Sequence, residues 1–264
     1  MPAKGVDLVP RALTIAGSDS GGGAGIQADL KAFAAAGVHG STAIVALTAQ
    51  NTVGVNAVYE LPTIVVREQL DAVWNDIGAD AAKTGMLFTR AIVEAVADWL
   101  VAHPLPLVVD PVMIASSGAR LLEDDAVESL VSRLFPLATV VTPNVPEARA
   151  ITGSDGLSQA QLAEKLVAMG APAALVTGGH AETSIDHLFD GAEHYEIPVE
   201  HHDVAATHGA GCTHSATIAA LLARGASVLE AAEGAAEAAS RAVAQGLVDV
   251  GKGDGPVDVL GITS

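Results

Sequence analysis

Short runs of apolar residues alternate along the chain with longer stretches in which apolar residues recur at helical spacing. Five of the short runs have the length and composition of buried strands: 12–17, 42–48, 105–109, 139–142 and 173–177. Helical spacing follows the first two runs, and a helical stretch precedes each of the others. Repeated strand–helix units of about 30 residues predict an α/β fold with a mostly parallel central sheet and helices on both faces.

Two features depart from this alternation. Residues 184–189 and 194–199 flank a turn at 190–193, which predicts a local antiparallel hairpin. The last third is rich in alanine and predicts helices over 212–223 and 228–248. Because no change in composition marks a linker, we expect a single domain over residues 1–264, with a flexible N-terminus over 1–11.

Composition and charge exclude several classes of protein. The chain has 264 residues, 50% of them apolar and 17% charged, which excludes a disordered protein. Its net charge of −18 excludes nucleic acid as a bulk partner, because binding to phosphates depends on cationic side chains. No run of about 18 apolar residues occurs, so we expect no membrane partner and a cytoplasmic location. One cysteine excludes a disulfide framework.

The loops after the strands are the candidate ligand sites, because ligands of such sheets bind beyond the carboxyl ends of the strands. The loop over 17–25 contains five glycines, follows a strand and opens a helix. Glycines there let backbone amides approach a ligand closely. The loop matches neither a Walker P-loop nor a dinucleotide fingerprint, and a flexible turn is the alternative interpretation.

A second glycine loop, Thr207-His208-Gly209-Ala210-Gly211-Cys212-Thr213, comes directly before an apolar helix. Its amides lie at the positive end of the helix dipole, an arrangement that stabilises a phosphate or a developing oxyanion. We expect the same position to lower the pKa of the Cys212 thiol, which fits a base or a nucleophile. The alternative is a small buried cysteine at a capped helix start.

Several charged and polar residues also follow strands. Asn144 and Glu147 suit the orientation of Mg²⁺-bound water, although residue type alone favours a helix cap. Asp110 ends a strand and is a second acidic candidate. Lys83 also ends a strand and needs a nearby carboxylate or ligand anion if it is buried. The spacing of the nine histidines fits no zinc site, so most are expected at the surface, and His208 alone is a candidate.

Together these strings resemble the ribokinase-like superfamily, and more closely the hydroxymethylpyrimidine/phosphomethylpyrimidine kinases of thiamine biosynthesis. The resemblance extends from Leu13 to about Val257 and rests on the strings at 15–31, 49–52, 83–87, 142–147, 178–180, 207–213 and 251–257. It implies a three-layer α/β/α fold without a separate lid domain, and a homodimer. It also implies two successive phosphorylations of 4-amino-5-hydroxymethyl-2-methylpyrimidine, to the monophosphate and then the diphosphate, with ATP and Mg²⁺.

The resemblance also implies roles for individual residues. The pyrimidine site comprises Gly17, Asp29, Gln50 and Met86. Asp110 and Glu147 place Mg²⁺, partly through water, and the ATP site comprises Asn144, Thr177, Gly178, His208 and Lys252. Gly209, Ala210 and Gly211 form the anion hole, with Cys212 where most superfamily members carry an aspartate base.

One departure from the family pattern concerns the phosphate site. Thr177 stands immediately before the Gly-Gly-His string, where family members commonly carry a lysine. A missing cation predicts weaker ATP binding or slower transfer.

Two other functions are compatible with the sequence. One is a pyridoxine or pyridoxal kinase, whose substrate is also a flat ring with a CH₂OH group. The other is a weakly catalytic pyrimidine-binding protein.

Overall fold

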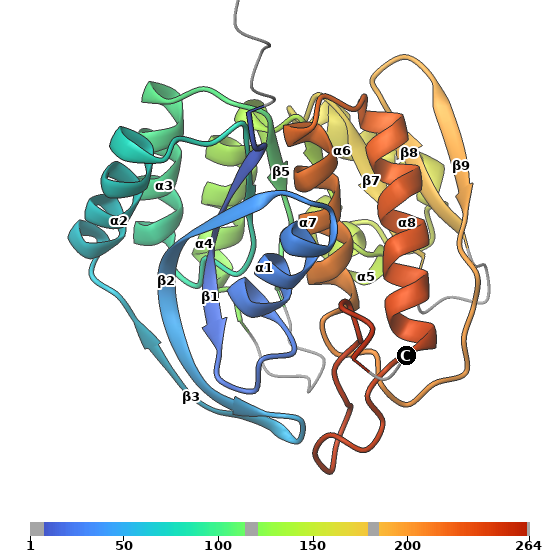
Figure 1. The fold of residues 1–264 in the computed structure, drawn as a ribbon. Helices are drawn as coiled ribbons and strands as arrows, with labels where there is room; N and C mark the ends of the chain where they lie inside the picture. The colour runs from blue at the N-terminus through green and yellow to red at the C-terminus, as the bar shows by residue number, and fades with distance from the viewer. Residues whose placement is uncertain (1–7, 114–120, 179–184, 263–264) are drawn as a thin grey trace, which may run out of the picture.

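The computed structural model describes residues 8–113, 121–178 and 185–262. Nine strands in these ranges form one sheet in the order β3-β2-β1-β4-β5-β6-β7-β8-β9 (Figure 1). The strands are β1 (Arg11–Asp19), β2 (His39–Asn51), β3 (Gly54–Glu60), β4 (Ala81–Thr84), β5 (Leu107–Val109), β6 (Val140–Val141), β7 (Ala174–Val176), β8 (Ile185–Phe189) and β9 (His194–Pro198). Strands β2, β1, β4, β5, β6 and β7 pair in parallel, whereas β3 at one edge and β8 and β9 at the other are antiparallel.

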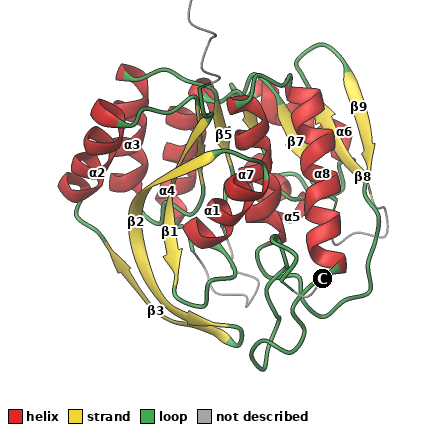
Figure 2. Cartoon of the chain, in the orientation of Figure 1, coloured by secondary structure: helices red, strands yellow, loops and turns green. Residues whose placement is uncertain are grey.

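Helices cover both faces of the sheet, so the fold has three layers (Figures 1 and 2). One face carries α1 (Gly25–Ala35), α7 (Ala210–Ala223) and α8 (Val228–Ala244). The other carries α2 (Thr63–Asp76), α3 (Arg90–Ala102), α4 (Asp124–Ser129), α5 (Val145–Thr152) and α6 (Gln159–Ala168), with a π-helical turn at Leu130–Leu134 and a 3-10 turn at Phe135–Leu137. Two apolar clusters form the core, and they lie between the sheet and these two helical layers.

The predicted α/β class, the parallel sheet and the antiparallel hairpin are confirmed. The sheet begins at Arg11, whose guanidinium binds Asp80, while residues 1–7 of the predicted flexible N-terminus lie outside the described ranges. Helix α8 ends at Ala244, four residues before the predicted end. Strand β3 was not predicted, because its short alternation of apolar and polar residues follows a turn that carries little sequence signal.

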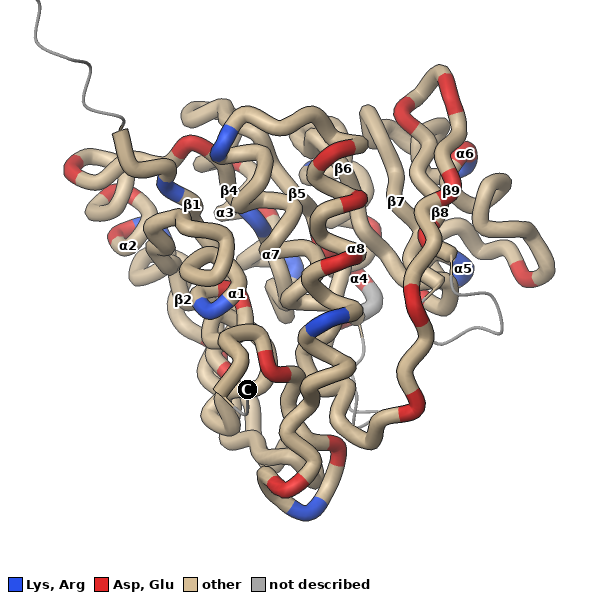
Figure 3. The backbone as a smooth tube through the Cα atoms, turned by 45° about the vertical axis from the view of Figure 1, so that its right-hand side comes forward, with Lys and Arg blue, Asp and Glu red and all other residues tan. Residues whose placement is uncertain are grey.

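The carboxyl ends of the parallel strands lie at the end of the molecule drawn at the bottom of Figure 1. The segment after α8 returns to this end, where Gly253 packs against Thr52 of the β2–β3 turn. Acidic residues are scattered over helices and loops in the view of Figure 3. Within the described ranges, no helix has the length and apolarity to cross a membrane.

Candidate active site

The two glycine loops meet through the carboxylate of Asp19, at the end of β1. Its Oδ1 accepts a hydrogen bond from the amide of Gly21 at 2.7 Å, and its Oδ2 accepts from the amides of Gly23 and Ala24 at 3.0 and 2.9 Å. The Nε2 atom of His208 lies 3.0 Å from the same Oδ2. Burial raises the pKa of Asp19, but the hydrogen bonds from His208 and the amides outweigh it and hold the pKa below its usual value.

Backbone contact between the loops explains one glycine of the second loop. Gly209 has a φ of +88°, and a Cβ atom there would overlap the carbonyl oxygen of Gly23. Gly211, two residues later at the start of α7, has open space where its Cβ would project. Packing within the chain therefore requires Gly209, whereas Gly211 is exposed and faces open space. This exposed helix start has room for a phosphate group. Among the described residues, the buried hydroxyl of Thr213 in the same turn has no hydrogen-bond partner.

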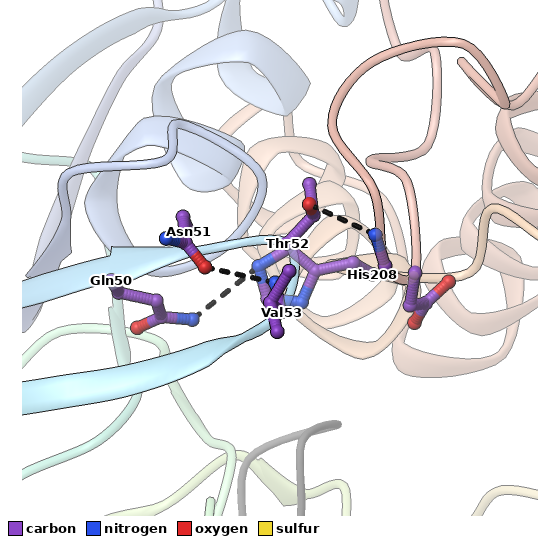
Figure 4. Close-up of a pocket in the computed structure, with 7 residues that line it drawn as sticks. Gln50, Asn51, Thr52, Val53 and His208 are labelled. Carbon is purple, nitrogen blue, oxygen red and sulfur yellow. Dashed lines mark hydrogen bonds between the residues drawn. The ribbon is translucent and has the colours of Figure 1, made fainter.

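A pocket of about 260 Å³ lies between the β2–β3 turn, His208 and the C-terminal loop (Figure 4). Its lining comprises Gln50, Asn51, Thr52, Val53, His208, Gly253 and Asp254. Ser20 of the first glycine loop holds Gln50 by its backbone, donating to the carbonyl at 2.7 Å and accepting from the amide at 2.8 Å. The side-chain amide of Gln50 therefore projects from a fixed backbone toward His208, 3.5 Å away (Figure 4).

The other predicted pyrimidine residues lie in two different environments. Met86 packs where a side chain at Gly17 would project, so Gly17 makes room for the thioether. Asp29 has no exposed surface. Gln50 lines the pocket, whereas Gly17, Asp29 and Met86 do not. Its carboxylate binds the hydroxyl of Thr14 and the ammonium of Lys83, because a buried charge must be compensated.

Lys83 is the centre of a buried charge cluster beneath the start of α7. Its Nζ lies 3.0 Å from Oδ1 of Asp29 and 3.6 Å from Oδ2 of Asp110, as the need for a carboxylate partner predicted. Although burial lowers the pKa of Lys83, the nearby acidic groups, chiefly Asp29, outweigh it and raise the pKa. Asp110 also accepts a 2.7 Å hydrogen bond from Ser215 of α7, which fixes its carboxylate.

The prediction for the Cys212 thiol was wrong in direction. Burial raises its pKa to about 12, and the nearby carboxylates of Asp29 and Asp110 act in the same sense. Lys83 and a backbone hydrogen bond with Gly25 lower the pKa, but they do not compensate for the loss of solvation. The helix start therefore holds a protonated thiol at neutral pH.

Asn144 and Glu147 form a capping box at the start of α5, the alternative that residue type favoured. Each Glu147 oxygen accepts one amide hydrogen bond, Oε2 from Asn144 at 3.0 Å and Oε1 from Met113 at 3.3 Å. Burial and the charge of Asp110 raise the pKa of Glu147 to about 8. Two buried carboxyl groups, one of which disfavours the ionisation of the other, with oxygen donors only, fit a site completed by Mg²⁺. Within the described ranges, no group of three or more His, Cys, Asp or Glu side chains could hold a metal ion.

The other predicted nucleotide residues lie in two loops, one after β7 and one near the C-terminus. Thr177 and Gly178 follow β7, and Thr177 pairs with Asn144 through a parallel bridge. Gly178 donates its amide to Oδ1 of Asp186 at 2.9 Å. Lys252 lies in the C-terminal loop, and its amide donates to Thr52 Oγ1 at 3.1 Å. The neighbours of Gly178 at 179–180, part of the motif, lie outside the described residues.

Several residues at or near the site were not predicted from the sequence. His214 of α7 is buried, although a surface position was expected, and lies 3.3 Å from Asp186. Away from the site, His187 is also buried and contacts His194. Asp19 is the hub of both glycine loops, and its place directly before a glycine run was an available signal. Thr52 and Asp254 join the C-terminal loop to the pocket, through Lys252 and Thr207 respectively, and only the fold places them together.

Comparison with known proteins agrees with this arrangement. A family model described as phosphomethylpyrimidine kinase matches residues 19–258. A hydroxymethylpyrimidine/phosphomethylpyrimidine kinase of Rhizobium meliloti is 47% identical over 253 residues, covering 93% of this chain and 95% of that protein.

Two solved structures share the fold. A pyridoxal kinase of Bacillus subtilis, solved as an ADP complex, superposes with a TM-score of 0.89 at 38% identity, covering 97% of this chain and 99% of that one. A phosphomethylpyrimidine kinase of Clostridium difficile superposes with a TM-score of 0.76 at 40% identity, covering 86% and 96%. The predicted loops gather at one end of a ribokinase-like sheet. Because the family model and the relatives match most of the chain, the chain belongs to the phosphomethylpyrimidine kinase family.

Proposed function

We propose that this kinase phosphorylates 4-amino-5-hydroxymethyl-2-methylpyrimidine and then its monophosphate, using MgATP, in thiamine biosynthesis. The observation that carries the proposal is the continuity of His208 with the second glycine loop. His208 lines the pocket beside Gln50 and leads directly to Gly209 and to the exposed helix start at Gly211. An alcohol on a ring in that pocket lies close to a phosphate held at the helix start.

Four residues serve the pyrimidine in this proposal. The Gln50 amide donates to and accepts from the edge of the ring, which suits an aminopyrimidine. Met86, seated against Gly17, packs on the face of the ring. Asp29 has no exposed surface, so its contribution is indirect: it holds the ammonium group of Lys83 in place through their ion pair.

The start of α7 supplies the chemistry of phosphoryl transfer. The amides of Gly209, Ala210 and Gly211 stabilise the charge on the transferred phosphoryl oxygens, and this compensates for the overall acidity of the chain. The Ala210 amide donates to the Thr207 carbonyl at 3.1 Å, so it must exchange that acceptor for the phosphate. Cys212 takes the proton of the substrate alcohol in the first phosphorylation. Its raised pKa makes the thiolate scarce at neutral pH, so this step is expected to accelerate as the pH rises.

Asp110 and Glu147 hold Mg²⁺, partly through water, and Asn144, Thr177, Gly178, His208 and Lys252 bind ATP. Mg²⁺ would neutralise charge on the phosphates. The buried pair of carboxyl groups and the open space at Gly211 support these assignments. We also propose a cytoplasmic homodimer that consists of one domain per chain, as the resemblance implies.

A side-by-side assay tests the proposal. ADP release is measured with hydroxymethylpyrimidine, with its monophosphate and with pyridoxal at equal concentrations of protein and MgATP. We expect turnover of both pyrimidines. The pyridoxal kinase structure that superposes at 38% identity makes pyridoxal phosphorylation the second candidate, and turnover of pyridoxal alone would establish it. Binding of hydroxymethylpyrimidine without ADP release would instead identify a pyrimidine-binding protein.

A further inference from the structure

Asp186 of β8 connects two segments of the proposed ATP site, although it belongs to none of the motifs. Its side chain is 5% exposed. Oδ1 accepts the amide hydrogen of Gly178 at 2.9 Å, directly after β7. Oδ2 lies 3.3 Å from Nε2 of His214, the fifth residue of α7. One carboxylate thus contacts both the β7 loop and the helix whose first amides form the anion hole.

The pairing of β7 with β8 does not require a carboxylate at position 186. Backbone pairing already joins β7 to β8 at three positions, Ala174 with Phe189, Leu175 with Leu188 and Val176 with His187. A buried carboxylate is costly unless its oxygens have partners. Its two partners, Gly178 and His214, lie in the β7 loop and in α7, which the proposed function assigns to ATP. Among the described loops, no backbone hydrogen bond joins these two segments.

His214 extends the connection toward the metal side of the site. It is buried, and the adjacent Ser215 donates a 2.7 Å hydrogen bond to Asp110. The polar series from Gly178 through Asp186 and His214 therefore ends beside Asp110. A shift of Asp186 would change the distance between Gly178 and the first turn of α7.

We propose that Asp186 is a positioning residue for the nucleotide, and that it sets the separation of the Gly178 amide and the anion hole. This inference rests on the proposed function, because Gly178 and α7 are assigned to ATP there. Asp186 does not touch the pyrimidine pocket, whose lining comes from the β2–β3 turn, His208 and the C-terminal loop. Its loss should therefore weaken nucleotide binding and leave pyrimidine binding intact.

The test compares Asp186→Ala, Asp186→Asn and His187→Asn with the parent. His187 is the next residue on β8, points to the opposite side of the sheet and is similarly buried, so it controls for general damage to the strand. Affinity for AMP-PCP is measured by calorimetry, and KM is measured for ATP and for hydroxymethylpyrimidine. We expect Asp186→Ala to weaken AMP-PCP binding and to raise KM for ATP about ten-fold or more, with KM for the pyrimidine changed less than about two-fold.

Asp186→Asn keeps an acceptor for the Gly178 amide and should recover part of the affinity, while His187→Asn should bind like the parent. If Asp186→Ala does not fold, the test rests on Asp186→Asn, for which we expect the affinity for AMP-PCP to fall about three-fold or more. Unchanged AMP-PCP affinity in the folded variant, or equal rises in both KM values, would overturn the inference. A parent that binds AMP-PCP but phosphorylates none of the substrates contradicts the proposed function, and the binding comparison still decides the role of Asp186. A parent that binds no nucleotide contradicts both.

Discussion

The Nζ atom of Lys83 lies 3.0 Å from Oδ1 of Asp29, and neither side chain reaches solvent. Removing one partner of a buried pair leaves the other charge without compensation. We expect Lys83→Met to lower the free energy of unfolding by about 3–5 kcal/mol, measured by urea denaturation.

The matched control is Arg11→Met, which breaks the 2.7 Å pair with Asp80 at a site where both side chains are more than one third exposed. Solvent screens such a pair, so we expect a loss of less than about 1 kcal/mol. Similar losses in the two variants would show that burial of the Lys83 pair does not determine its contribution.

The two glycines of the anion hole are expected to respond differently to substitution. Gly211→Ala should fold, since its Cβ would meet no atom of the protein, yet the methyl group would occupy the proposed phosphate position. We expect an unchanged melting temperature and a loss of about 10²-fold or more in both phosphorylations. Gly209→Ala, which forces a Cβ onto the Gly23 carbonyl, should instead lower the melting temperature. Full activity in Gly211→Ala would show that the phosphate does not bind at this position.

The pattern of residues predicted the frame of the sheet and the end at which the site lies. Buried parallel strands have continuous apolar runs, so β1 and β2 were predictable, whereas the half-exposed β3 was not. The glycine loops could be located because each follows or precedes an element that the pattern identifies.

Partners across long sequence distances could not be predicted. Asp19 and His208 are 189 residues apart, and their contact depends on the sheet order. The pKa of Cys212 illustrates the same limit, because a helix start predicts a lowered value and only the fold shows the burial and carboxylates that raise it. Local chemistry is readable from sequence, but the solvation and charge around a side chain are not.

Thr177 stands where the family commonly has lysine, and the structure places it beside Asn144 at the end of β7. Thr177→Lys adds a cation near the proposed phosphate position, so we expect tighter binding of MgATP in calorimetry. Thr177→Met adds a side chain of similar reach without charge and should bring no gain. Unchanged or weaker affinity in Thr177→Lys would show that another group already fills the role.

Glu147 gives a prediction for the pH dependence of stability. Its pKa rises from 4.5 to about 8 on folding, so the folded state holds the proton more tightly than the unfolded state. The stability associated with this proton is present below pH 4.5 and is lost as the pH rises toward 8. Glu147→Gln cannot ionise, so its advantage over the parent should grow from pH 5 to pH 8 and then remain constant. Urea denaturation with a chelator present measures this difference, and a constant offset at every pH would contradict the assignment.

Cys212 is expected to matter unequally for the two phosphorylations. In the first, the attacking alcohol must lose a proton as the new P–O bond forms, whereas in the second a phosphate oxygen is already anionic. We expect Cys212→Ala to slow the first step by about 10²–10⁴-fold and the second far less. Single-turnover rates with each substrate measure the difference.

The raised pKa of Cys212 supplies an independent signature of the same role. Because a thiol with a pKa of about 12 is mostly protonated at neutral pH, the thiolate fraction and the first-step rate should both increase about ten-fold for each pH unit between 7 and 9. Cys212→Ala should remove this slope, and the second phosphorylation should lack it in the parent. Gly211→Ala serves as the control, since it weakens both steps without altering the thiol and should keep the slope. Equal losses in the two steps, with a slope that survives in Cys212→Ala, would mean that Cys212 shapes the anion hole and that another group accepts the proton.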